Sequence, residues 1–90
     1  MIAKRYIIKG RVQGVGFRYF VYRKALQLSI KGYVKNLSNG DVEVEAVAFD
    51  ENIKEFEKHL WKGPVLSNVI KIKITEIPNT LNYSSFEIRY

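Results

Sequence analysis

Hydrophobic and polar residues alternate along several segments of the chain, which is the period of a β-strand with one buried face. The predicted strands are residues 4–12, 32–36, 41–47, 69–75 and 85–90. Their apolar positions are expected to face the core, namely Tyr6, Ile8, Val12, Val42, Val44, Ala46, Ile70, Ile72 and Ile74. Glu43 and Glu45, and likewise Lys71 and Lys73, fall between these positions and are predicted to face solvent.

One segment after the first strand has the apolar spacing of a helix. The predicted helix starts at Phe17 and ends near Ser29, before Lys31-Gly32. Its apolar stripe consists of Phe17, Phe20, Val21, Ala25 and Leu28.

A second helix is predicted after the third strand. Asp50 or Asn52 is expected to cap it, and Asn52 and Glu55 have the spacing of a capping box. Gly63-Pro64 should end it. Its apolar stripe is Ile53, Phe56 and Leu60, and Trp61 is expected to pack in the core or at the helix end.

The order of elements is strand, helix, strand, strand, helix, strand, strand. Asn39-Gly40 predicts a hairpin between the second and third strands, because both residues tolerate positive φ. An antiparallel sheet of four to five strands with two helices packed on one face would bury every apolar stripe. The sequence therefore predicts one α+β domain over residues 1–90, with the ferredoxin-like split βαβ arrangement. Many unrelated functions use this fold.

Charge and residue content narrow the classes of function. Fifteen basic and nine acidic residues give a net charge of +6, which favours anionic partners. The chain has no cysteine and one histidine, His59, so thiolate catalysis and multi-histidine metal centres are excluded. His59 is expected at the surface. We expect a cytoplasmic protein, because no apolar run reaches the length of a membrane span or a secretory signal.

A glycine-rich connection between the first strand and the first helix is the most informative segment. Its backbone N–H groups could bind an anion together with the helix N-terminus, which no Ser, Thr, Asp or Asn caps. Arg18 in the first turn opposes the helix dipole and suits two phosphate oxygens. The P-loop and dinucleotide-binding motifs are both absent. An anion site and a plain turn with a solvated arginine are about equally supported by these residues alone.

Two blocks of the chain resemble a known family. Residues 10–18 are similar to the first acylphosphatase signature, Gly-x-Val-Gln-Gly-Val-x-Phe-Arg, and residues 32–42 resemble the second, Gly-aromatic-Val-basic-Asn-x-x-x-Gly-x-Val. Gly63-Pro64 and the closing Phe-x-Ile-x-Tyr, which ends at Tyr90, also look like this family. One position departs from the pattern: Ala48 replaces a usual glycine, which we expect to affect a strand end or bulge.

The resemblance implies an enzyme that hydrolyses acyl phosphates to carboxylate and inorganic phosphate without a metal or cofactor. It assigns phosphate binding to Arg18 and water orientation to Asn36. The backbone N–H groups of the connection would bind the phosphate, at Gln13, Gly14, Val15, Gly16, Phe17 and Arg18. In some relatives the C-terminal carboxylate pairs with the arginine, which would here be a contact between Tyr90 and Arg18.

Further properties stay open at this stage. Taken alone, Asn36 is better explained as a turn residue that binds its own backbone. The rival functions are a basic nucleic-acid-binding module and a non-catalytic anion-binding module. With little chain left for an acyl pocket, broad tolerance of the acyl group is predicted, and the physiological acyl phosphate is not identified. A monomer that contacts no membrane is expected.

Overall fold

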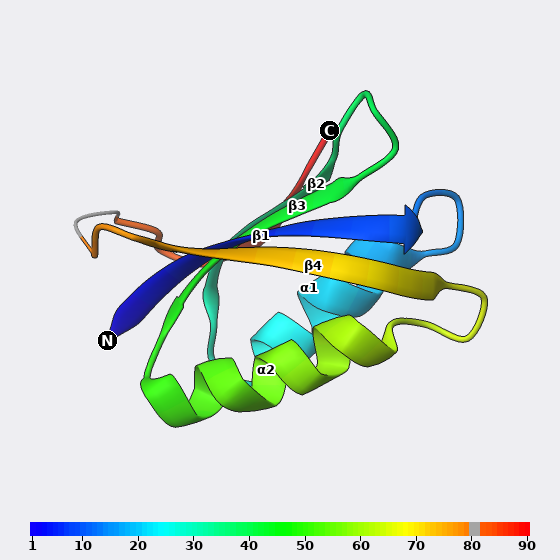
Figure 1. The fold of residues 1–90 in the computed structure, drawn as a ribbon. Helices are drawn as coiled ribbons and strands as arrows, with labels where there is room; N and C mark the ends of the chain where they lie inside the picture. Colours follow the sequence, from blue (N-terminus) through cyan, green and yellow to red (C-terminus); the bar gives the residue numbers. More distant parts are fainter. Residues whose placement is uncertain (80–81) are drawn as a thin grey trace.

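The computed structural model describes residues 1–79 and 82–90, and its elements follow the predicted order (Figure 1). The strands are β1 (Ile2–Arg11), β2 (Lys31–Asn36), β3 (Val42–Ala48), β4 (Asn68–Ile77) and β5 (Phe86–Arg89). The helices are α1 (Phe17–Gln27) and α2 (Asp50–Lys62). In the described residues, no helix is long and apolar enough to cross a membrane.

The five strands form one sheet in the order β4-β1-β3-β2-β5. The pairs β1–β3, β1–β4 and β2–β3 are antiparallel, whereas β2 and β5 are parallel. The sheet is therefore mixed, and the prediction of an antiparallel sheet was wrong in its last strand. The reason is the path of the chain: β4 ends at the end of the sheet where β2 begins. Because β5 begins at the same end of the sheet, it runs in the direction of β2.

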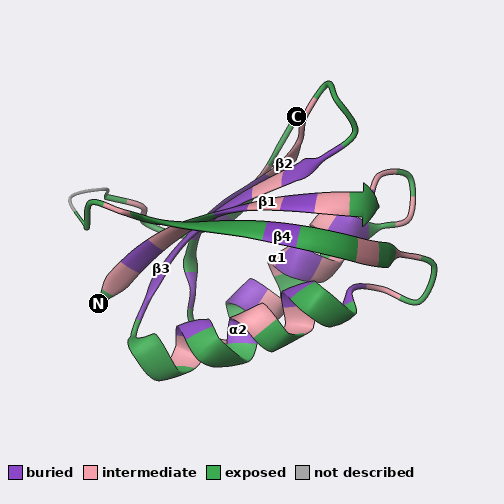
Figure 2. Cartoon of the chain, viewed as in Figure 1, coloured by how far each residue is buried: buried purple, intermediate pink, exposed green. Residues whose placement is uncertain are grey.

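Both helices pack on one face of the sheet, as predicted, and the core lies between the two layers (Figures 1 and 2). Most of the predicted inward positions are buried there. The confirmed ones are Tyr6, Ile8, Val12, Phe17, Val21, Ala25, Val42, Val44, Ala46, Ile53, Phe56, Leu60 and Ile72. Phe20 and Leu28 are partly buried against this core. The hydrophobic pattern alone therefore located the layer interface.

The prediction for β4 was correct for Ile72 only. Ile70 is 71% exposed and Ile74 is 41% exposed. A register shift between Lys9 and Gly10 of β1 leaves Ile70 without a partner, and Val69 takes the inward position instead. Ile74 faces the helices on an edge strand that α2 covers incompletely. Both differences follow from a bulge and an edge, which alternation does not reveal.

The second helix begins differently from the prediction. Its N-cap is Phe49, and no side chain caps it. Asn52 instead donates its Nδ2 hydrogen to the carbonyl oxygen of Leu28, at 3.0 Å, and so joins α2 to the end of α1. The helix ends at Gly63 as predicted, whereas Trp61 is 48% exposed, not packed in the core.

The connection between β2 and β3 is wider than a two-residue hairpin. The N–H of Leu37 donates to the carbonyl of Asp41 at 2.8 Å, and the N–H of Gly40 donates to the carbonyl of Leu37 at 3.2 Å. Gly40 has a φ of 98°, and Asn39 accepts the N–H of Asp41 with its side-chain oxygen. The prediction of a turn at Asn39-Gly40 was therefore correct in position, but the turn is not a two-residue hairpin turn. Ala48 ends β3 as an ordinary buried strand residue opposite Ile2.

Glu45 lies on the sheet face away from the helices but is only 4% exposed, so its predicted position in solvent was wrong. Arg5 binds it with Nε at 2.8 Å, and the Tyr83 hydroxyl donates to its other oxygen. Burial raises the pKa of the Glu45 carboxyl, but these hydrogen bonds lower it by more, and the resulting pKa lies below the ordinary value. The carboxylate thus contributes to stability as an anion.

Replacing Glu45 by glutamine should make the stability of the protein less sensitive to acid. A carboxyl with a lowered folded-state pKa stabilises the fold above its unfolded pKa, and this contribution is lost as pH falls through the folded pKa. At pH 7 the variant should be less stable by about 1–3 kcal/mol, since Arg5 and Tyr83 lose a charged acceptor. The difference should shrink well below pH 4.5.

Urea unfolding at pH 7 and in acid measures this effect. Glu87→Gln is the matched control, because Glu87 pairs with Arg89 at an exposed position. An equal difference between Glu45→Gln and the unchanged protein at both pH values would contradict the interpretation.

Candidate active site

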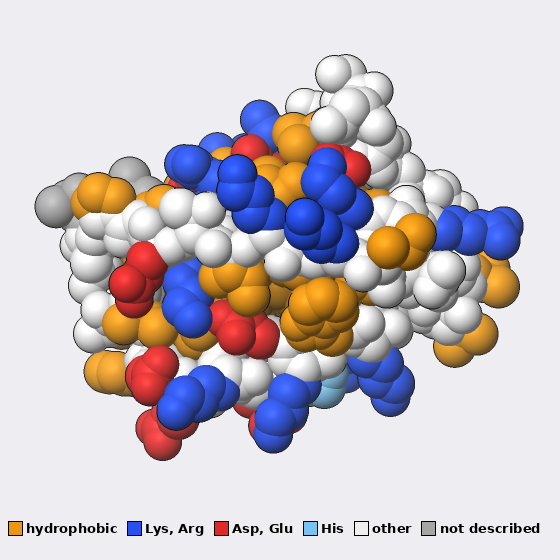
Figure 3. Space-filling view, in the orientation of Figure 1, with side chains coloured by type: hydrophobic (Ala, Val, Ile, Leu, Met, Phe, Trp, Pro, Cys, Tyr) orange, Lys and Arg blue, Asp and Glu red, His pale blue; other side chains and the backbone are white. Residues whose placement is uncertain are grey.

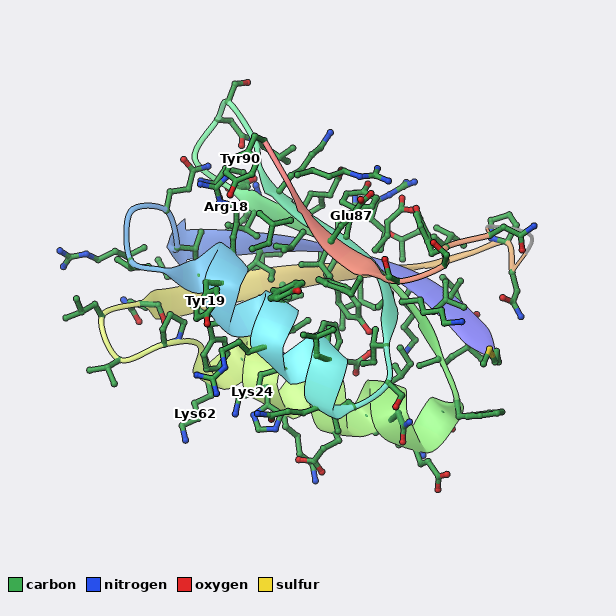
Figure 4. The ribbon with its side chains drawn as sticks, turned by 180° about the vertical axis from the view of Figure 1, so that it is seen from behind. Arg18, Tyr19, Lys24, Lys62, Glu87 and Tyr90 are labelled. Atoms are coloured by element: carbon green, nitrogen blue, oxygen red, sulfur yellow. The ribbon has the colours of Figure 1, made fainter. Side chains whose placement is uncertain are left out.

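The ends of β1, β2 and β5 lie at one end of the sheet, because all three strands run in the same direction. The connection from β1 to α1 and the first turn of α1 lie at the same place (Figure 4). A pocket of about 260 Å³ opens there. The fold therefore brings three segments that are distant in sequence to a single surface depression: residues 12–19, Asn36 and residues 88–90.

Most of the predicted site residues line this pocket. They are Gly14, Gly16, Phe17, Arg18 and Asn36. Gln13 and Val15 do not line it. The Gln13 side chain instead donates to the carbonyl oxygens of Leu37 and Asp41, at 2.7 and 2.8 Å. It thereby ties the β1–α1 connection to the loop that follows Asn36, which holds the two halves of the pocket together.

The β1–α1 connection presents free backbone donors. Gly14 and Gly16 have φ values of 74° and 78°, in the left-handed region that favours glycine. Gly16 is the N-cap of α1, and no side chain caps the helix, as predicted. The first backbone bond at this end runs from Phe20 N–H to Gly16 C=O at 3.1 Å. Within the described part of the chain, no protein acceptor binds the N–H groups of residues 14–19.

Arg18 reaches the pocket from the first turn of α1. Its guanidinium carbon lies 4.7 Å from the centre of the Tyr90 ring, and its Nη1 is 3.5 Å from the carbonyl oxygen of Arg89 (Figure 4). Among the described residues it forms no ion pair. The contact expected from the Tyr90 carboxylate is therefore made by the Tyr90 ring. The guanidinium keeps its other hydrogen-bond donors available beside an uncapped helix end.

Asn36 is the last residue of β2. Its side-chain oxygen is buried and accepts no hydrogen bond from any residue that the structure describes. An unpaired buried acceptor costs about 1–3 kcal/mol, so folded proteins usually pair such groups. The interpretation of Asn36 as a turn residue that binds its own backbone does not account for this oxygen. A donor from outside the protein, such as water, would satisfy it.

Four lining residues were not predicted as parts of the site. They are Val12, Tyr19, Ile88 and Tyr90, the last considered only for its carboxylate. Ile88 and Tyr90 lie in the closing Phe-x-Ile-x-Tyr block, so that block was the available signal. His59 is on α2, partly exposed, with Nε2 3.7 Å from a Glu55 oxygen. No group of three or more metal-ligating side chains occurs among residues 1–79 and 82–90.

Known proteins resemble this chain over its whole length. A family model described as acylphosphatase matches residues 4–88. A curated acylphosphatase of Archaeoglobus fulgidus is 46% identical over the full length of both chains, and one of Pasteurella multocida is 38% identical, also over both full lengths.

Solved structures agree with these matches. The crystal structure of acylphosphatase from Bacillus subtilis has a TM-score of 0.97 and 38% identity, and each chain is covered completely. An acylphosphatase from Coxiella burnetii has a TM-score of 0.92 and 39% identity, and covers 98% of this chain and 92% of its own. The fold, the sequence blocks and these relatives lead to one conclusion: this chain belongs to the acylphosphatase family and is an enzyme of that type.

Proposed function

We propose that the protein hydrolyses the carboxyl-phosphate bond of acyl phosphates, with Arg18 and the β1–α1 connection binding the phosphoryl group and Asn36 orienting water. The observation that carries this proposal is a buried Asn36 oxygen that accepts no hydrogen bond from the described residues, in the same pocket as a guanidinium that pairs with none of their carboxylates. The first group needs a donor and the second an anion. A water molecule and a phosphoryl group side by side meet both needs.

The reaction requires little from the protein beyond the positioning of the reactants and of hydrogen-bond donors. A carboxylate leaves easily because its conjugate acid has a low pKa, so no general acid is required. The transition state of phosphoryl transfer is loose, and its charge is spread over the three phosphoryl oxygens. Hydrogen-bond donors fixed before the reaction stabilise that charge without reorganisation. The free N–H groups of residues 14–18 and the Arg18 fork are donors of this kind.

The water is proposed to donate one hydrogen to the Asn36 oxygen, so that its lone pair points at phosphorus in line with the leaving oxygen. The new bond joins the water oxygen to phosphorus, and the bond between phosphorus and the carboxyl oxygen breaks. The electron pair leaves on the carboxylate. Because asparagine is not a base, a phosphoryl oxygen or the solvent takes the proton. No covalent enzyme intermediate is expected.

The nucleic-acid alternative has weaker support. Figure 3 shows Lys and Arg side chains gathered over the strands, which would attract a polyanion. However, modules of this fold stack bases on aromatic residues of the open sheet face. Tyr33 on that face is only 7% exposed, and the Arg89 guanidinium covers its ring at 4.2 Å. A cytoplasmic location and a monomeric state stay predictions from the sequence.

Phosphate release from benzoyl phosphate in the presence of EDTA tests the proposed function directly. We expect turnover that chelator does not reduce, since only backbone and side-chain donors act on the phosphoryl group. Inorganic phosphate should inhibit competitively. RNA binding measured at low and moderate salt is the companion assay. No hydrolysis of benzoyl phosphate, together with salt-sensitive RNA binding, would favour the alternative and contradict the proposal.

A further inference from the structure

A second cavity, of about 320 Å³, adjoins the active-site pocket along the exposed side of α1. Gly16 and Tyr19 line both cavities. A molecule whose phosphoryl group lies in the first cavity can therefore extend past Tyr19 into the second without leaving the protein surface. The substrate of the proposed reaction has such a second part, namely its acyl group.

The second cavity carries positive charge. Arg23 and Lys24 line it, and none of the described acidic side chains does. Within the part of the chain that the structure describes, neither cation forms an ion pair. In Figure 4 Lys24 extends away from the sheet, in the same direction as Lys62 from the end of α2. Two adjacent cations without counter-charges favour an anionic ligand.

Aromatic rings form part of the wall. The Arg23 guanidinium lies 5.9 Å from the centre of the Tyr19 ring, and the Lys24 ammonium lies 5.6 Å from that of Phe20. Tyr19 is 60% exposed, so its ring offers apolar surface between the two cavities. A carbon chain can lie on such a surface while a charged end meets the cations. The cavity therefore suits an organic anion better than a bare inorganic one.

Given the proposed function, we propose that the second cavity is a subsite for an anionic group on the acyl part of the substrate. The enzyme accordingly prefers acyl phosphates that carry a second anionic group, separated from the phosphoryl group by a short carbon chain. Arg23 and Lys24 bind that charge, and Tyr19 contacts the linker. This preference narrows the broad acyl tolerance expected from the sequence.

A pair of substrates of equal length tests the subsite. Hexanoyl phosphate and adipoyl monophosphate differ only in that the latter ends in a carboxylate. The wild-type kcat/KM should be about tenfold higher for adipoyl monophosphate, the effect of one or two partly exposed charge-assisted hydrogen bonds. The double variant R23Q/K24Q should lose this preference and keep its activity on hexanoyl phosphate. High salt should weaken the preference in the wild type.

The matched control is K71Q/K73Q, which removes the same charge from exposed positions on β4. It should keep the preference for adipoyl monophosphate. Equal activity of the wild type on both substrates would overturn the subsite and leave the proposed function intact. A preference that survives in R23Q/K24Q would also overturn it. Failure of the wild type to hydrolyse either substrate would instead refute the proposed function, and the subsite with it.

Discussion

Replacing Arg18 by alanine is expected to lower kcat/KM for benzoyl phosphate by about 10²–10³-fold or more. One donor fixed against transition-state charge is typically worth that factor, and the guanidinium offers a bidentate pair. Its environment supports this role, since it lies in the pocket and pairs with no carboxylate among the described residues. Initial rates of phosphate release give the measurement.

Phosphate binding without turnover separates the role of Arg18 from general damage to the protein. A ligand that binds only the folded state raises the melting temperature. Inorganic phosphate should raise the melting temperature of the wild type and change that of Arg18→Ala little. The melting temperature without phosphate should change little, because the polar contacts of the side chain with the described residues are a ring contact and one long hydrogen bond.

Two further variants sharpen this prediction. Arg11→Ala removes the same charge from an exposed residue at the end of β1, outside the pocket, and should keep both activity and the phosphate effect. Arg18→Lys keeps the charge but loses the planar fork, so it should recover only part of the activity. Full activity in Arg18→Ala, or an equal loss in Arg11→Ala, would show that overall charge and not this guanidinium matters.

The positions of the two main candidate residues were predicted from sequence, and their roles stay predictions. Arg18 and Asn36 belong to two sequence blocks, and the structure brings both into one pocket. Gln13 was also singled out, but for its backbone. Its side chain joins Leu37 and Asp41 across the sheet end, a contact that depends on the register of β2 with β3 and is invisible in the local pattern.

The errors have a common physical origin in the neighbours of each residue. The alternation of apolar and polar residues along a strand predicts which residues share a face of the sheet. It does not predict whether other parts of the protein cover that face. Ile74 faces the helices on an edge strand and is exposed, whereas Glu45 is on the open face and is buried by Arg5 and Tyr83. Asn52 could have capped its own helix, yet the carbonyl of Leu28 lay within reach. Tertiary contacts decided each case.

Asn36→Ala is expected to lower kcat by about 10²-fold or more while leaving phosphate affinity nearly unchanged. The reason is that the amide is proposed to orient the attacking water, and small errors in such positioning are costly. The phosphoryl group itself is bound by other groups. The inhibition constant of inorganic phosphate measures ground-state binding, and kcat on benzoyl phosphate measures the reaction. The two should separate in this variant, whereas both should worsen in Arg18→Ala.

Stability provides a second, independent readout for Asn36. Its buried oxygen has no hydrogen-bond partner in residues 1–79 and 82–90, so alanine removes a group that costs free energy in the fold. We therefore expect Asn36→Ala to be as stable as the wild type or more so, despite its lost activity. A residue kept for turn structure would give the opposite result, with reduced stability and retained turnover.

Asn39→Ala is the matched control, because Asn39 lies in the same β2–β3 connection and binds Asp41 with both side-chain polar atoms. It should lose stability and keep most of its activity. Asn36→Asp retains an acceptor of nearly the same shape but adds a negative charge beside the phosphoryl group, which should weaken phosphate binding. If Asn36→Ala turned over benzoyl phosphate at the wild-type rate, another group would have to orient the water. The proposed assignment of phosphate binding to Arg18 and water orientation to Asn36 would then be wrong.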